Sequence, residues 1–139
     1  MLSPPMLSLT ALTGTWSCER QSGTRTTPAA LILTFQLWGD WLRSDVAEKG
    51  ETTQEAFMKY DPKMKQWIEV QIGARGDYAV TTSNAAPSAS KQTWTAAYPN
   101  DSLHRVVIKQ YLGDKIVIDH TLEVDGKTEP IHDVCTRTV

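Results

Sequence analysis

Long hydrophobic runs are missing from this chain of 139 residues: no stretch approaches the roughly 20 consecutive apolar residues that span a bilayer. An excess of charge is missing too, because 14 basic and 16 acidic side chains leave a formal net charge of -2. We therefore expect no membrane span and neither nucleic acid nor an acidic membrane as a partner. Residues 1–9 lack the basic and apolar regions of a signal peptide, so we expect none in this chain.

The common catalytic and metal-binding motifs are also missing. His104, His120 and His132 are spaced too widely to form a His-x-His pair, and no Cys-x-x-Cys occurs. The sequence contains no glycine-rich phosphate loop, no Gly-x-Ser-x-Gly elbow and no His-Glu-x-x-His helix. We therefore expect no metal site and no cofactor, and motif-bearing hydrolases, kinases and zinc proteases have no support.

What the sequence does contain is a repeated strand pattern. Helical periodicity is weak throughout, whereas short β-branched and aromatic runs recur between turn signals. This pattern predicts an all-β fold, with residues 1–139 forming one closed antiparallel up-and-down β-barrel of about ten strands. The strands are expected at 14–21, 29–38, 41–48, 52–60, 66–73, 77–83, 91–98, 103–112, 115–124 and 130–138.

Two segments do not fit the strand pattern. Residues 1–12 contain Pro4-Pro5 and then Leu7, Leu9 and Leu12, which a short helical or 3₁₀ turn would place in one end of the barrel as a cap. Residues 83–90 are small and polar, which is typical of a long loop at a barrel mouth.

The two cysteines lie almost at opposite ends of the chain. Directly opposed residues in an antiparallel ladder have a constant sum of residue numbers, so a Cys18–Cys135 pair also places Trp16 opposite Arg137. This register predicts a disulfide, a guanidinium over an indole, and pairing of the first strand with the last, which closes a barrel. The alternative is two buried thiols. A bridge would indicate an exported protein, periplasmic or secreted, and free thiols a cytoplasmic one.

The same register indicates which side chains face the lumen. If Asp125-Gly126 and Gly113-Asp114 are two-residue turns, one face continues from the last strand across the two strands before it. On strand 115–124 that face carries Ile116 and Ile118, while most of the alternate residues are polar, so it is predicted to point inward. Its polar members are Arg20, Arg105, Lys109, Tyr111, His120 and Asp133.

Three cations against one carboxylate in this set favour an anionic or carbonyl-bearing ligand, or water, because a buried charge is costly unless it is paired. Structural alternatives stay open. A three-residue turn would instead turn His104, Val106, Ile108 and Gln110 inward. Arg20 and Asp133 could form only a salt bridge that supports closure, and His120 could be a hydrogen-bonded core histidine.

Aromatic residues provide a further set of candidate ligand contacts. Tyr60, Trp67, Tyr78 and Trp94 are spread over four predicted strands. Tyr and Trp suit cavity walls because the ring packs while its N–H or O–H finds a partner. Core packing is the alternative role for each of them.

Several short motifs together resemble a known superfamily. They are Gly14-Thr15-Trp16-Ser17-Cys18, Tyr60-Asp61-Pro62 followed by Trp67, Gly76-Asp77-Tyr78, Val124-Asp125-Gly126-Lys127 and Cys135-Thr136-Arg137. This set is similar to the calycins, in which an arginine of the closing strand packs on a Gly-x-Trp strand. Over essentially the full chain it resembles bacterial lipocalin-like domains of uncharacterised function. The resemblance implies a small barrel with a central cavity and an N-terminal cap, often exported, but no activity.

A more distant resemblance is to nitrobindin-like haem barrels, which use a histidine on a late strand as the iron ligand. His132 and His120 are the positions to compare. His132 is predicted to lie opposite Gln21, on the face away from the lumen, and His120 lies one strand earlier than the family's ligand.

These observations predict a protein that binds a small, partly apolar ligand in the barrel, as a monomer or homodimer. Arg20, Arg105, Lys109 or His120 would orient an anionic or carbonyl end of that ligand. One alternative is a cofactor-free isomerase or cyclase with His120 as the acid-base group, supported by Asp133 or Tyr111. The other is a haem carrier.

Overall fold

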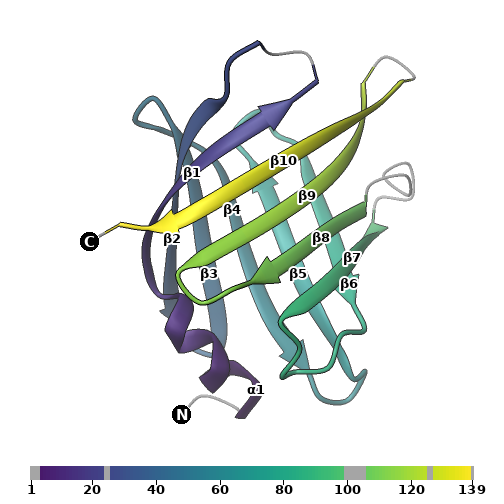
Figure 1. Ribbon diagram of the computed structural model, residues 1–139. Helices are drawn as coiled ribbons and strands as arrows, with labels where there is room; N and C mark the ends of the chain where they lie inside the picture. Colours follow the sequence, from purple (N-terminus) through teal and green to yellow (C-terminus); the bar gives the residue numbers. More distant parts are fainter. Residues whose placement is uncertain (1–3, 24–25, 99–105, 125–126, 139) are drawn as a thin grey trace.

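Ten antiparallel strands form a closed up-and-down barrel, in which β1 pairs with both β2 and β10 (Figure 1). The computed structural model describes residues 4–23, 26–98, 106–124 and 127–138, with the backbone alone at 122–124 and 127. The strands are β1 Gly14–Ser22, β2 Ala29–Trp38, β3 Trp41–Glu48, β4 Glu51–Asp61, β5 Gln66–Gly73, β6 Tyr78–Ser83, β7 Lys91–Tyr98, β8 Val106–Tyr111, β9 Lys115–Val124 and β10 Lys127–Arg137. The predicted fold class and up-and-down order are confirmed.

The largest difference from the predicted bounds is at β10, which begins three residues earlier than expected, at Lys127. Proline cannot donate to a ladder and is therefore common at the start of a strand. The β1–β10 pairing ends at Ser22 and Ile131, so Pro130 lies beyond that ladder, where its missing N–H breaks no bond to β1. Residues 103–105, expected in the eighth strand, and the turn at 125–126 lie outside the described residues.

The register derived from the cysteines is confirmed. Cys18 lies opposite Cys135 and Trp16 opposite Arg137. The two sulfur atoms form a disulfide, and the Cα atoms are 4.0 Å apart, within the roughly 7 Å limit for a bridge. On the chain-entropy model, closing a loop of this length stabilises the fold by about 5 kcal/mol. The bridge therefore joins the first and last strands where the barrel closes.

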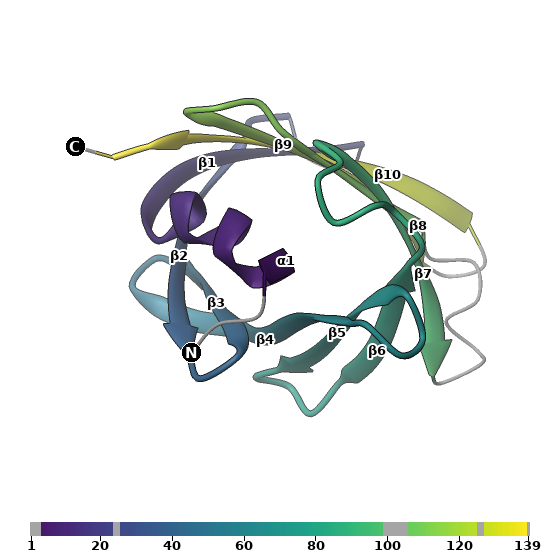
Figure 2. The same cartoon turned by 90° about the horizontal axis from the view of Figure 1, so that it is seen from below.

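A short cap crosses one end of the barrel (Figure 2). It consists of α1 Pro4–Leu7 and the 3₁₀ helix η1 Ser8–Leu12. Leu9 and Leu12 are buried as expected, but Leu7 is 55% exposed, so its expected place in the barrel is wrong. Met6 is buried instead, because residues three apart share one face of a tight helix and Met6 continues the row of Leu9 and Leu12.

The cap is attached to the barrel by Trp16 and Arg137. The Trp16 indole nitrogen donates a hydrogen bond to the Leu12 carbonyl at 2.9 Å. The Arg137 guanidinium lies 4.3 Å from the Trp16 ring centroid and donates to the carbonyls of Thr13 and Ala11. The predicted cation over an indole is thus present and also closes the capped end.

The position of a residue along its strand shows whether it lies near the capped end of the barrel or near the opposite end. In an up-and-down barrel all odd-numbered strands begin at one end, here the capped one. Trp16, Trp67 and Trp94 lie near the starts of β1, β5 and β7 and are fully buried, so they form a floor next to the cap. The loop at 84–90, between β6 and β7, lies at the same end. Among the described residues, the helices are too short to cross a bilayer.

Candidate functional site

The lumen holds a cavity of about 80 Å³ beyond the tryptophan floor. A water molecule occupies ~30 Å³ in the liquid, so this space accommodates a few waters or one small organic group. The apolar part of the wall comprises Cys18, Leu31, Leu33, Phe35, Val46, Ala56, Met58, Val107, Ile116, Ile118 and Cys135. The polar part comprises Arg20, Ser44, Gln54, Glu69, Gln71, Lys109, Tyr111, His120 and Asp133.

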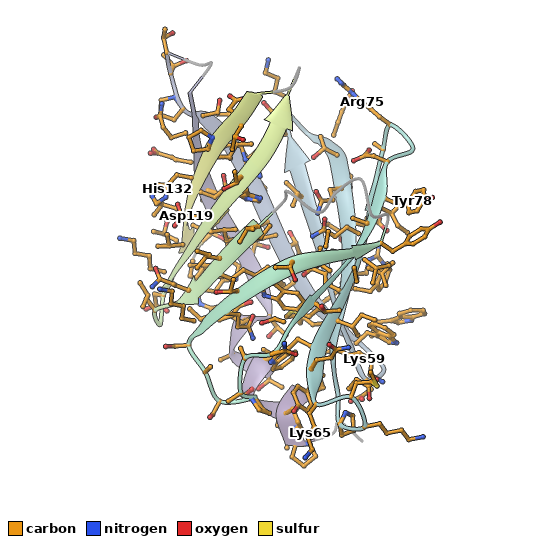
Figure 3. The ribbon with its side chains drawn as sticks, turned by 90° about the vertical axis from the view of Figure 1, so that its right-hand side faces the viewer. Lys59, Lys65, Arg75, Tyr78, Asp119 and His132 are labelled. Atoms are coloured by element: carbon orange, nitrogen blue, oxygen red, sulfur yellow. A yellow bond between two sulfur atoms is a disulfide. The ribbon has the colours of Figure 1, made fainter. Side chains whose placement is uncertain are left out.

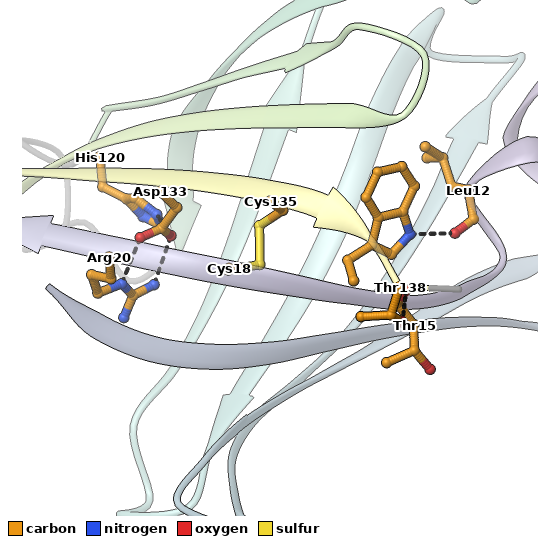
Figure 4. Close-up of a disulfide and its surroundings, with 9 residues drawn as sticks. Leu12, Thr15, Cys18, Arg20, His120, Asp133, Cys135 and Thr138 are labelled. Carbon is orange, nitrogen blue, oxygen red and sulfur yellow. Dashed lines mark hydrogen bonds and ion pairs between the residues drawn. A yellow bond between two sulfur atoms is a disulfide. The ribbon is translucent and has the colours of Figure 1, made fainter.

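One polar group comes from β1, β9 and β10 (Figure 4). Arg20 donates two hydrogen bonds to the carboxylate of Asp133, from Nε to Oδ1 at 2.8 Å and from Nη2 to Oδ2 at 2.9 Å. His120 Nε2 lies 2.9 Å from Asp133 Oδ2. Arg20 and Asp133 are directly opposed, whereas His120 is diagonal to Asp133, within reach of a long side chain. These three side chains form a connected ionic group, which we call the Asp133 group.

The Asp133 group keeps its carboxylate ionised. Burial raises the pKa of Asp133, but the hydrogen bonds and charges of Arg20 and His120 outweigh burial and lower the pKa to about 2. The hydrogen bond to Asp133 raises the pKa of Arg20 against the opposing effect of burial. The group therefore contains a fixed ion pair and a histidine that faces the cavity.

A second polar group reaches across the lumen from β5 to β8. Lys109 Nζ lies 2.6 Å from Glu69 Oε2 and 4.5 Å from the centroid of the Trp94 ring. Glu69 is paired with the small, inward Thr81 on β6, and Lys109 is paired with Gln92 on β7. Gln71 Nε2 donates to the other Glu69 oxygen at 2.6 Å.

Glu69 changes the charge balance that the sequence predicted. Arg20 and Lys109 each have a carboxylate within 3 Å, so among the described lumen residues these two cations are both neutralised. Arg105, the third predicted cation, lies outside the described residues. The described part of the lumen is polar but carries no excess of guanidinium and ammonium over carboxylate.

Tyr111 lies between the second polar group and the capped end. Its hydroxyl donates a hydrogen bond to Gln92 Oε1 at 3.2 Å, and the Trp94 indole nitrogen donates to the same oxygen at 3.2 Å. Burial, followed by the charge of Glu69, raises the pKa of Tyr111. Tyr111 is therefore a neutral phenol at physiological pH, which limits it to donating and accepting hydrogen bonds.

The predicted aromatic contacts divide between the floor and the outer surface. Tyr60 packs edge-on against Trp67, with ring centroids 5.2 Å apart, and Trp94 is buried beside Lys109, so these three rings lie below or beside the cavity. Tyr78 is 55% exposed on the outer surface and stacks on Tyr98. The structure thus places Tyr78 away from the lumen.

The histidines are separated in the same way. His120 faces the lumen, whereas the side chain of His132 is 51% exposed on the outer face, where it contacts Asp119. The two lie on opposite faces because His120 is paired with the inward, buried Val107, whereas His132 is paired with the outward, exposed Gln21. Within the described ranges, no cluster of three His, Cys, Asp or Glu side chains is arranged to bind a metal ion.

Sequence reasoning missed Glu69 and Gln71. Strand β5 alternates Trp67, Glu69 and Gln71 with Ile68, Val70 and Ile72, and hydrophobicity alone would place the isoleucines and the valine inside. The burial pattern is the reverse. The available signal was the short turn before β5, because an inward Met58 on β4 requires Glu69, its partner, to point inward as well.

Comparison of the chain with protein-family models and with curated proteins finds no match. The closed ten-stranded antiparallel barrel is consistent with a calycin-like fold. A functional assignment therefore rests on the fold and the cavity.

Proposed function

We propose that this protein is a lipocalin-like member of the calycins that binds a small, partly apolar, carbonyl-bearing molecule inside its barrel. The observation that carries the proposal is a cavity whose wall is largely apolar and includes the Asp133 group. Binding sites of this kind take the ligand body by apolar contact and fix its orientation with a few polar groups. The disulfide supports an exported location, because such bridges persist in oxidising compartments.

The charge balance favours a carbonyl over an anion. An anionic ligand would have to compete with Asp133 for Arg20 and with Glu69 for Lys109, both at hydrogen-bond distance. A neutral carbonyl oxygen does not need to displace a carboxylate, because a guanidinium has five N–H donors and an ammonium three. A ketone, aldehyde or ester is therefore the ligand class that fits these residues.

The cavity volume limits the enclosed part of the ligand. At about 80 Å³ it is well below the roughly 300–1,000 Å³ of pockets for drug-sized molecules. A porphyrin is much larger than this space, and His120 Nε2 is engaged by Asp133, so the residues present do not fit a haem. Rearrangement of flexible wall residues such as Met58 would admit a longer alkyl chain.

A second candidate function rests on the 2.9 Å contact between His120 and Asp133 at the cavity wall. A carboxylate that orients a histidine is the arrangement used for general acid–base catalysis. A cofactor-free isomerase that moves a proton next to the ligand carbonyl would use this pair. Tyr111 would serve only as a neutral hydrogen-bond donor in such an enzyme.

The test is a calorimetric titration with two probes of equal carbon number, methyl hexyl ketone and octanoate. We expect the ketone to bind at least tenfold more tightly, and His120→Ala to weaken ketone binding. His132→Ala is the matched control, because this histidine also contacts a carboxylate but lies outside the barrel. Tighter binding of octanoate, or equal effects of the two substitutions, would contradict the proposal. Conversion of an unsaturated ketone by the wild type but not by His120→Ala would favour the enzyme.

A further inference from the structure

The outer surface of the barrel carries an apolar face that the ligand-binding proposal does not use. Because β5 turns its polar side chains inward, Ile68, Val70 and Ile72 point outward. The pairing of β4 to β7 places Phe57 next to Val70, Val70 next to Val80 and Val80 next to Tyr98. These four side chains form a row across four strands, which we call the central row.

Further apolar side chains extend this face on both sides of the central row. Ile72 lies opposite Tyr78 on one side, and Trp38 packs on Phe57 with ring centroids 5.5 Å apart. Trp38, Tyr78 and Tyr98 are 63%, 55% and 57% exposed. At roughly 200 Å² for each aromatic side chain, these three alone expose on the order of 350 Å².

An apolar patch of several hundred Å² is about as large as the largest patch on a typical monomer, and such patches are often functional. The opposite side of the barrel has a different character, since it presents the Asp119–His132 pair. Figure 3 shows this division, with Tyr78 and Lys59 projecting on one side of the barrel and His132 and Asp119 on the other.

We propose that this outer face of β4–β7 binds a second copy of the same chain in a two-fold symmetric dimer. The two-fold axis lies in the interface and runs along the central row, so Val70 contacts the partner's Val70. The two-fold rotation about this axis places the residues on one side of the row opposite the partner's residues from the other side. Ile72 therefore meets the partner's Ile68, and apolar side chains contact apolar ones along the whole centre of the interface.

Charge complementarity supports a second copy as the occupant. Glu55 and Lys59 lie on β4, one on each side of Phe57, and both point outward. The proposed axis places Glu55 beside the partner's Lys59, twice by symmetry. Glu55 already accepts a hydrogen bond from Arg43 at 3.0 Å, and a carboxylate has lone pairs for a further donor. A single face that is both apolar and self-complementary in charge fits a copy of itself.

The first experiment is sedimentation velocity of the disulfide-intact protein over a concentration series. A face of this size is at the small end of specific interfaces, so we expect a dimer with a Kd on the order of micromolar. Val70→Glu and Ile72→Lys should each raise this Kd at least a hundredfold. Val117→Glu, at an outward position on β9, is the matched control and should leave the dimer intact, with circular dichroism spectra unchanged in all three variants.

The second experiment tests the register. Glu55→Lys and Lys59→Glu should each weaken the dimer by about tenfold at low salt, and the double charge exchange should restore it. Val70→Cys should form an intermolecular disulfide under mild oxidation, whereas Val117→Cys should not. A wild type that is monomeric at every concentration would overturn the proposal and leave the face to another protein. A dimer that survives both Val70→Glu and Ile72→Lys, or no rescue by the charge exchange, would overturn it as well.

Discussion

Asp133→Asn removes the charge of the lumen carboxylate while keeping its shape, and it tests whether the Asp133 group stabilises the barrel. The pKa of this carboxyl falls from an ordinary 3.8 to about 2 in the folded protein, because the hydrogen bonds and charges of Arg20 and His120 outweigh the effect of burial. A difference of this size corresponds to about 2.4 kcal/mol of folding free energy at pH 7. We expect Asp133→Asn to lower the free energy of unfolding by about this amount, and by somewhat more if Arg20 is left without an anion.

The sign of the pH dependence follows from the lowered pKa. An acid whose pKa is lower in the folded than in the unfolded state stabilises the fold. This contribution is fully present above the pKa of the unfolded state and is lost as the pH falls through the pKa of the folded state. The difference between wild type and Asp133→Asn should therefore shrink to about 1.3 kcal/mol at pH 3 and below about 0.5 kcal/mol at pH 2.

The assay for Asp133→Asn is urea unfolding between pH 7 and pH 2 with the disulfide intact, because the slope with urea shows whether the unfolded state has changed. Asp119→Asn is the matched control: Asp119 also contacts a histidine, but it is 51% exposed, so the substitution should cost less than about 1 kcal/mol. Equal costs for the two substitutions would refute the reasoning. So would a cost of Asp133→Asn that stays constant from pH 7 to pH 2.

Three further variants test the closure and the floor of the barrel. Replacing Cys18 and Cys135 together by serine should lower the free energy of unfolding by about 5 kcal/mol, and an unchanged urea midpoint would contradict the role of the bridge. Arg137→Met keeps the aliphatic stem but removes the cation and its bonds to the cap. It should speed amide exchange at Met6, Leu9 and Leu12, whereas unchanged exchange there would show that the cap is held by apolar packing alone. Tyr111→Phe should cost about 1 kcal/mol for the lost hydrogen bond and leave the phenolate absorbance near pH 10 unaltered; loss of a chromophore in that range would contradict a neutral Tyr111.

The closing side of the barrel is predictable from the sequence because its elements constrain one another. Two cysteines fix the register of β1 and β10, and short turns carry that register to β9 and β8. Alternate side chains of a strand share one face, so this register assigns His120, Lys109 and Tyr111 to the lumen. The confirmed pairings place them there. Hydrophobic alternation on β9 sets which face points inward, and the register then assigns the other strands without a further hydrophobicity argument, which is why polar residues on this side were found.

The opposite side is less predictable because the chain has no comparable marker there. The ladder between β3 and β4 shifts register at Val46 and Ala47, and a bulge reverses the facing of every residue beyond it. Hydrophobic alternation is also misleading on β5, where the apolar set faces outward and Glu69 faces the lumen. The inward polar side chains of β5 and the apolar outer face share this cause, and the short turn before β5 was the signal for both.

The measurement that tests the binding proposal most directly is an NMR experiment that locates the ketone in methyl-labelled protein. Nuclear Overhauser effects from bound methyl hexyl ketone are expected to the methyl groups of Ile116, Ile118 and Val107, which line the cavity. Effects only to Val70 and Ile72 on the outer face, or none at saturating ketone, would contradict a ligand site in the lumen.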